Sequence, residues 1–155
     1  MVELAIVGEP GLSLDKRELA RVGPSYTFDS LTEIRAEIGP VRPLCIAIGG
    51  DAVQKIDGWH RWQELLQLAH IIVMARPGWQ WPVQGHVAKW LDNHLAKAED
   101  SPTMAPAGSI FKLQLRQLDI SASEIRSLLT SGRSAGYLLP DQVLTYIKEN
   151  SLYDH

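Results

Sequence analysis

Apolar and polar residues follow one another along this chain in blocks that predict strands and helices in turn. Residues 44–48 and 71–74 are continuous apolar runs, which is typical of parallel strands buried on both faces. Residues 110–115 form a third strand-like run. Between the first two, residues 59–68 have helical spacing, with an inward face made by Trp62, Leu65, Leu66 and Ala69. A strand, a helix and a strand imply a right-handed parallel crossover, so the pattern predicts an α/β fold.

Further helices flank these strands in the pattern. Residues 25–38 carry Leu31, Ile34 and Ile38 on one face and stop at Gly39, which predicts a helix with a glycine end. Residues 83–95 predict another helix. Residues 97–108 are rich in Pro, Ala and Ser and predict a surface loop.

The opening of the chain is unusual for a domain. Residues 1–7 have a helical pattern, which Glu9-Pro10-Gly11 breaks before a short strand-like piece at 12–14. A helix without a start signal or a preceding partner is not expected to begin a domain. The pattern therefore predicts the last turns of a longer helix.

Residues 120–126 describe a helix N-terminus with donors for an anion. Ser121 and Glu124 have the spacing of a capping box. The free N–H groups and the helix dipole favour an anion there, with the Ser123 hydroxyl and the Arg126 guanidinium as further donors. The residues alone leave two interpretations open: a phosphate site, or a capped helix whose buried stripe is Ile125, Leu128 and Leu129.

Composition narrows the class of protein. A chain of 155 residues with 45% hydrophobic content suits one globular domain over residues 1–155. The formal net charge of −3 offers no polybasic surface for nucleic acid and favours a small charged ligand. The single cysteine, Cys45, excludes an internal disulfide and fits a reducing compartment. No apolar run predicts a membrane span and no signal segment opens the chain, so we expect a cytoplasmic protein.

The motif at 120–126 resembles the Ile-Ser-x-Thr/Ser-x-Ile-Arg signature of bacterial nicotinate-nucleotide adenylyltransferases, members of the nucleotidyltransferase α/β-phosphodiesterase superfamily. The resemblance extends over almost the whole chain, through the segments 15–19, 23–27, 48–52, 68–73, 75–78, 132–134 and 137–141. It implies a Rossmann-like nucleotidyltransferase fold, with a parallel sheet and flanking helices. It also implies transfer of the adenylyl group from ATP to nicotinate mononucleotide, which gives nicotinate adenine dinucleotide and pyrophosphate.

The resemblance implies a nicotinate mononucleotide site on five residues. Trp59 would stack on the cationic pyridine ring, a contact worth about 0.5–2 kcal/mol. Thr27 and the backbone N–H of His60 would bind the carboxylate. For Asp51 both ligand contact and helix capping stay open. For Arg76 both contact with the ligand phosphate and a surface ion pair stay open.

The outer phosphates of ATP would lie on Ser121, Ser123 and Arg126, and Mg²⁺ would arrive with ATP. His86 and His94 stand eight positions apart on a predicted helix, but two histidines without a third ligand are a poor metal site. The prediction therefore contains no metal held by the protein.

One departure from the family pattern matters most. The family's catalytic loop, Gly-Gly-x-Phe-Asp-Pro-x-His-x-Gly-His, is not in this sequence, and Gly85-His86 after Val83 matches only its last half. We therefore predict no catalytic residue in this chain, and an N-terminally truncated domain without its first βα unit and second strand, roughly 60 residues. A misplaced start or a true fragment would both explain this. The truncation would expose the edge of residues 44–48 and lead to self-association.

Two alternative functions remain open. The chain could be a non-catalytic nucleotide-binding remnant, or an adenylyltransferase for another acceptor, such as nicotinamide mononucleotide or pantetheine phosphate. Trp59 and the segment at 24–27 favour nicotinate over pantetheine. Donors around Thr27 and His60 suit a carboxylate better than an amide, so we expect the acid to be preferred.

Overall fold

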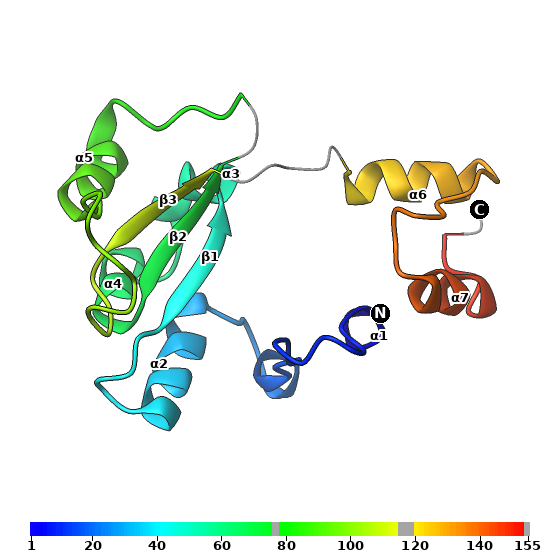
Figure 1. Ribbon diagram of the computed structural model, residues 1–155, viewed down its shortest axis with the longest axis horizontal. Helices are drawn as coiled ribbons and strands as arrows, with labels where there is room; N and C mark the ends of the chain where they lie inside the picture. Colours follow the sequence, from blue (N-terminus) through cyan, green and yellow to red (C-terminus); the bar gives the residue numbers. More distant parts are fainter. Residues whose placement is uncertain (76–77, 115–119, 154–155) are drawn as a thin grey trace. The chain divides into compact units, whose positions relative to one another are not determined.

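The computed structural model describes residues 1–75, 78–114 and 120–153 (Figure 1). The chain divides into two compact units, each of which is considered by itself. The larger unit is Arg17–Gln117, and the smaller unit combines Met1–Lys16 with Leu118–His155.

The larger unit is built on a parallel sheet with the strand order β1-β2-β3, as Figure 1 shows. The strands are β1 (Cys45–Gly49), β2 (His70–Ala75) and β3 (Ile110–Gln114). The three predicted strands and their parallel arrangement are confirmed. The strand expected at 12–14 is wrong, because these residues belong to neither a helix nor a strand in the structure.

Two predicted helices of this unit are confirmed. They are α2 (Thr27–Ile38) and α5 (Gly85–His94). Gly39 ends α2 with a φ of 83°, a conformation that suits glycine. The predicted loop at 97–108 is confirmed: it contains neither a helix nor a strand, and its residues 98–99 and 102–107 form turns and bends.

The single helix expected at 59–68 is wrong. The segment instead contains η3 (Trp62–Glu64) and α4 (Leu65–Leu68), after η2 (Ile56–Gly58). The helix cannot run through Arg61, whose φ of 52° lies in the left-handed region. Two shorter elements complete the unit, η1 (Arg17–Ala20) and α3 (Gly50–Val53).

One face of the sheet carries the core of the larger unit. Ile71 and Val73 of β2 and Ile110 of β3 are fully buried there. They pack in one cluster with residues of the surrounding helices and turns, namely Phe28, Leu31, Val53, Ile56, Leu65, Leu66, Val87, Trp90 and Leu91.

The opposite face of the sheet is much more exposed. Ile72 and Met74 are half-buried, and Cys45, Ala47 and Leu113 are exposed. The register places Ala47, Ile72 and Phe111 side by side on this face. The expectation that residues 44–48 are buried on both faces is therefore wrong, because β1 is an edge strand with one side uncovered in this structure.

The described part of the smaller unit consists of helices and their connections. These helices are α1 (Val2–Ala5), α6 (Ala122–Thr130) and α7 (Asp141–Glu149), and α1 packs against α7. The helix predicted at 1–7 is confirmed in a shorter form. The stripe expected to be buried on α6 is only half-buried. None of the helices in the described parts of the chain has the length and apolar character needed to cross a membrane.

Candidate functional site

The start of α2 and the turn before η3 lie together in the larger unit. Thr27 is the first residue of α2, and the two rings beside it both face His60. The ring centroid of His60 is 4.5 Å from that of Tyr26 and 6.4 Å from that of Phe28. The structure thus brings the surroundings of Thr27 and His60 to one place, as a shared ligand would require.

An ion pair lies in the turn that carries His60. The guanidinium of Arg61 lies 3.8 Å above the ring of Phe28 and hydrogen-bonds the carboxylate of Glu64. The hydrogen bond from Arg61 lowers the pKa of Glu64, and the same bond raises the pKa of Arg61. Both side chains are therefore charged at neutral pH and form an ion pair within the left-handed turn.

Trp59 is half-buried and packs against the core, and Trp62 does the same. The ring of Trp62 meets that of Trp90 edge to face, with centroids 4.9 Å apart. Trp62 is therefore a packing residue, as the sequence suggested. Trp59 keeps enough exposure for a ligand to contact it, and its stacking role stays a prediction.

Asp51 follows the carboxyl end of β1, where ligands bind in open α/β sheets. It does not cap α3: the N-cap is Gly49, and Asp51 is an exposed residue inside the first turn. The capping interpretation is therefore wrong, and ligand contact by Asp51 stays a prediction. Arg76, the fifth predicted residue of this set, lies outside the described residues.

The N-terminus of α6, in the smaller unit, has the donors that its sequence predicts. The hydroxyl of Ser121 accepts a hydrogen bond from the backbone N–H of Glu124 at 3.1 Å, so Ser121 is the N-cap. Nη2 of Arg126 lies 3.2 Å from Oγ of Ser123. Ser123 and Arg126 are exposed, and together they present a hydroxyl and a guanidinium at the positive end of the helix.

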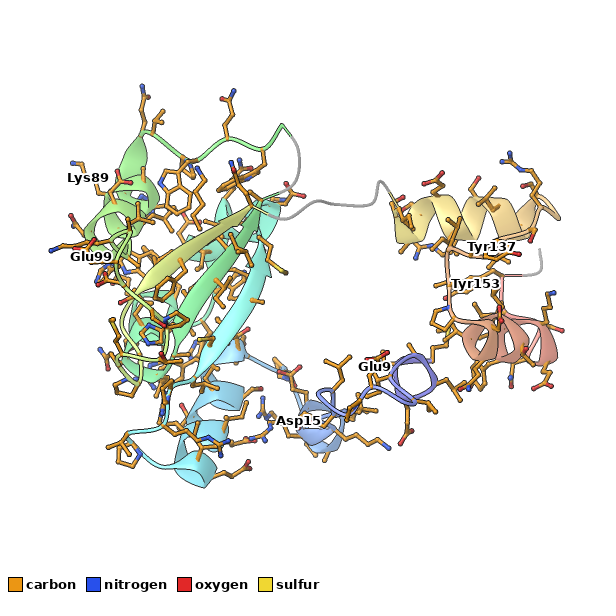
Figure 2. The ribbon with its side chains drawn as sticks, viewed as in Figure 1. Glu9, Asp15, Lys89, Glu99, Tyr137 and Tyr153 are labelled. Atoms are coloured by element: carbon orange, nitrogen blue, oxygen red, sulfur yellow. The ribbon has the colours of Figure 1, made fainter. Side chains whose placement is uncertain are left out.

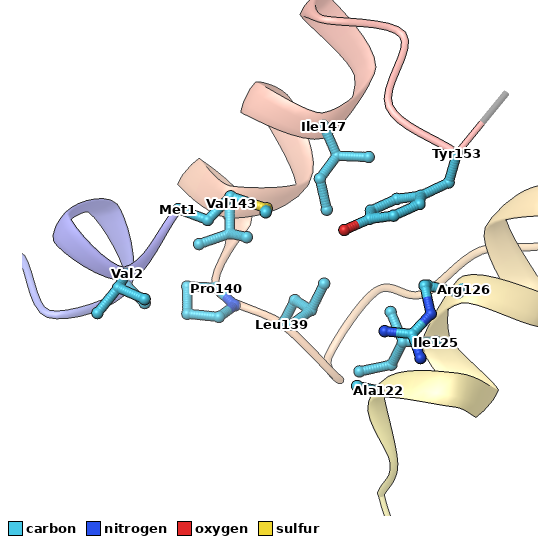
Figure 3. Close-up of a pocket in the computed structure, with 11 residues that line it drawn as sticks. Met1, Val2, Ala122, Ile125, Arg126, Leu139, Pro140, Val143, Ile147 and Tyr153 are labelled. Atoms are coloured by element: carbon cyan, nitrogen blue, oxygen red, sulfur yellow. The ribbon is translucent and has the colours of Figure 1, made fainter. Parts of the chain in front are cut away.

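Arg126 also borders an apolar pocket of about 240 Å³ within the smaller unit. Ile125 and Ala122 of α6 line it on one side, and Val143 and Ile147 of α7 line it on another (Figure 3). Tyr137, from the segment that resembles the family, is fully exposed and is not among the residues that line this pocket. Figure 2 labels it on the connection between α6 and α7.

The two histidines of α5 have separate partners. Nε2 of His86 is 3.1 Å from Oδ2 of Asp57, and Nδ1 of His94 is 2.7 Å from the backbone oxygen of Trp90. Within residues 1–75, 78–114 and 120–153, no three His, Cys, Asp or Glu side chains are grouped as metal ligands.

The sequence analysis did not single out Trp79, which lies at the carboxyl end of β1 in the structure. Its indole covers Gly50, the residue before Asp51. The sequence does contain a signal for this contact. Two consecutive glycines end an apolar strand, and a tryptophan follows the next strand along the chain, a combination that could have indicated a ring lying on the backbone.

The comparisons with known proteins first identify the class of protein to which this chain belongs. The cytidylyltransferase-like family model matches residues 1–128, most of the chain. Among solved structures, a Plasmodium falciparum nicotinic acid mononucleotide adenylyltransferase complexed with NaAD has a TM-score of 0.57 at 19% identity, over 84% of this chain and 58% of its own. The same enzyme complexed with APC has a TM-score of 0.61 at 16% identity, over 99% and 73%. At these identities the likeness concerns the fold, and it confirms the Rossmann-like nucleotidyltransferase architecture.

Sequence relatives are much closer. A probable nicotinate-nucleotide adenylyltransferase of Cellvibrio japonicus is 48% identical over 153 residues, which are 99% of this chain and 72% of the relative. One from Hahella chejuensis is 42% identical over 99% of this chain and 70% of its own length. The chain therefore belongs to the cytidylyltransferase-like family and, within it, to the nicotinate-nucleotide adenylyltransferases.

Proposed function

We propose that this protein serves the transfer of the adenylyl group from ATP to nicotinate mononucleotide. In this reaction a phosphate oxygen of the mononucleotide forms a bond to the α-phosphorus of ATP, and the bond from that phosphorus to the pyrophosphate oxygen breaks. The products are nicotinate adenine dinucleotide and pyrophosphate. The observation that carries the proposal is the 48% identity with the Cellvibrio japonicus relative over 153 residues.

The larger unit would bind the nicotinate mononucleotide. Thr27 and the backbone N–H of His60 would donate to the carboxylate, and Trp59 would stack on the positively charged ring. The juxtaposition of His60 with both neighbours of Thr27 supports this assignment. Asp51 and Arg76 complete the proposed set.

Ser121, Ser123 and Arg126 in the smaller unit would bind the outer phosphates of ATP. The support is the cap of α6 and the 3.2 Å contact between Arg126 and Ser123. Mg²⁺ would enter as part of the Mg-ATP substrate. We place the reaction in the cytoplasm, where ATP is available to biosynthetic enzymes.

We further propose that residues 1–155 are the C-terminal part of one nucleotidyltransferase domain, and that they bind substrates without catalysing the transfer. The family's His-x-Gly-His motif is not in the sequence. When the bond to the α-phosphorus breaks, negative charge grows on the leaving pyrophosphate, and Arg126 would stabilise it there, but Arg126 would not replace donors at the α-phosphate itself. Acceleration requires donors at the α-phosphate, where charge develops.

The test is to measure pyrophosphate release with ATP and nicotinate mononucleotide. The chain of 155 residues should show no turnover above background. The same chain joined to the additional N-terminal residues of the Cellvibrio japonicus relative should show turnover. Robust turnover by the chain of 155 residues would overturn the placement of the catalytic groups, whereas an inactive fusion that folds and binds ATP would contradict the proposed reaction.

Nicotinamide mononucleotide provides the control for substrate choice, because it differs from the proposed acceptor only by an amide in place of the carboxylate. We expect the active fusion to have a much lower kcat/KM with the amide, since its NH₂ group cannot be satisfied by donors. Comparable values for both acceptors would remove Thr27 and His60 from carboxylate recognition.

A further inference from the structure

The indole of Trp79 lies directly on the backbone of Gly50. A Cβ atom at Gly50 would be 2.5 Å from Cδ2 of Trp79 and 2.6 Å from its Nε1, too close for any side chain. Only glycine therefore permits this contact. The ring of Trp81 lies 5.8 Å away, nearly perpendicular, and packs against the same core.

The Nε1–H group of Trp79 is buried and has no hydrogen-bond partner among the residues that the structure describes. A buried donor without an acceptor costs about 1–3 kcal/mol. Trp81, two residues later, shows the usual arrangement, because its Nε1 donates to Oδ1 of Asp92 at 3.0 Å. The unpaired donor of Trp79 is thus a local exception within one short segment.

The position of this donor indicates which acceptor it could serve. Gly50 follows the last residue of β1 and precedes Asp51, and the carboxyl ends of parallel strands are where ligands bind in open α/β sheets. A mononucleotide bound there would present ribose hydroxyls and phosphate oxygens, all of which accept hydrogen bonds. Trp79 is half-buried and not fully enclosed, and a rotation of its side chain away from Gly50 would turn Nε1 towards such an oxygen.

We propose that Trp79 is a further substrate-binding residue, whose Nε1–H donates to a ribose or phosphate oxygen of the bound mononucleotide. This inference rests on the proposed function. In this structure the donor is buried over Gly50 and has no partner among the described residues. Binding of the mononucleotide gives this donor an acceptor. The free-energy cost of the unpaired donor is then removed, which makes binding more favourable.

The experiment is titration of the chain of 155 residues with nicotinate mononucleotide, comparing Trp79→Phe with the unsubstituted chain. Phenylalanine keeps an aromatic ring on Gly50 and removes the N–H donor. We expect the dissociation constant to rise about 5- to 20-fold, as for loss of one hydrogen bond to a polar or charged acceptor. Titration with nicotinate riboside tells the two oxygen sources apart: if the acceptor is a ribose hydroxyl the same rise appears, and if it is the phosphate the rise disappears.

Trp81→Phe is the matched control. It makes the same change of ring in the same segment but removes a paired donor, so it should lower the melting temperature more than Trp79→Phe and leave the dissociation constant unchanged. A direct readout is the indole N–H resonance that Trp79→Phe removes from the ¹H–¹⁵N spectrum. In the unsubstituted chain that resonance should move downfield when nicotinate mononucleotide is added, and that of Trp81 should not.

Unchanged affinity in Trp79→Phe, or a Trp79 resonance that does not move on binding, would overturn the inference and leave the proposed function intact. An equal loss of affinity in Trp81→Phe would also overturn it, because the effect would then arise from packing of the segment. If the unsubstituted chain does not bind nicotinate mononucleotide at all, the inference and the proposed mononucleotide site both fail.

Discussion

The two faces of the sheet differ in burial, although both are formed by apolar residues of the same strands. On one face Ile71, Val73 and Ile110 are fully buried under helices and turns. On the other, Ile72 is half-buried beside exposed Ala47 and half-buried Phe111. Ile71 and Ile72 are consecutive residues of one type, so only the side to which they point accounts for the difference.

This comparison separates two kinds of information in a strand. A continuous apolar run indicates that both sides of the strand suit burial. Whether both sides are buried depends on which other segments are present to cover them. The apolar run at 44–48 correctly predicts a strand and overestimates its burial, because the open face of β1 has no such cover among the described residues.

The largest expected effect compares the two isoleucines directly. Ile71→Ala should lower the free energy of unfolding by about 2–5 kcal/mol, because it leaves a cavity in a fully packed cluster. Ile72→Ala should cost less than about 1.5 kcal/mol, since its side chain already contacts solvent. Urea unfolding of both variants, followed by circular dichroism, measures the difference.

Equal losses in the two variants would contradict the difference in burial between the two faces. They would mean that the open face is covered in solution, by another copy of the chain or by another part of it. Repeating the measurement at tenfold lower protein concentration distinguishes these two cases, because only cover by another copy depends on concentration.

The elements of the larger unit could mostly be predicted from the sequence, because their signals are local. Apolar runs gave β1, β2 and β3, and Gly39 marked the end of α2. The helix at 59–68 failed because the left-handed turn at Arg61 is held by its contacts with Phe28 and Glu64. The contact with Phe28 joins positions far apart in the chain, so the spacing of apolar residues at 59–68 gives no sign of it.

Contacts within the candidate site also differ in whether the local sequence predicts them. The cap on Ser121 depends on residues within one turn, and the sequence predicted it. The hydrogen bond from Arg126 to Ser123 lies within the same turn, but the sequence predicted these two side chains only as separate donors to an anion. The contact of Trp79 with Gly50 joins residues that are far apart in the chain, so the neighbours of either residue do not predict it, and the signal appears only when the two glycines at the end of β1 and the tryptophan after β2 are taken together. The roles of Thr27, Trp59 and His60 came from a family resemblance and remain to be tested on this chain.

A charge placed on the open face tests whether that face drives association. An apolar edge strand beside an open apolar face should associate with further copies of the chain. Leu113→Lys should therefore raise the concentration needed for self-association by about tenfold or more, equivalent to about 1.4 kcal/mol. Its effect on unfolding should stay within about 0.5 kcal/mol, because Leu113 is already exposed. Sedimentation velocity over a range of concentrations measures the association.

Val83→Lys is the matched control, because Val83 is also an exposed apolar residue but lies outside the sheet. It makes the same change in net charge. If both variants reduce association equally, net charge and not the open face is responsible. A chain that is monomeric without either substitution would contradict the prediction at once.

The smallest expected effect concerns Cys45, on the exposed side of β1. Although this side chain is exposed, partial burial against the apolar sheet raises the pKa of its thiol. The thiolate should therefore form at higher pH in the folded chain than in the chain unfolded in urea, and iodoacetamide labelling across a pH series measures both midpoints.

Below the pKa of the unfolded thiol both states are protonated and stability does not change. Above it the unfolded chain loses its proton first, so the free energy of unfolding should fall slightly as pH rises through the folded pKa. Cys45→Ser should remove this decline while leaving the open face in place. A folded midpoint at or below the unfolded one would show that Cys45 is as well hydrated as a free thiol, and that the open face is wetter than its apolar residues suggest.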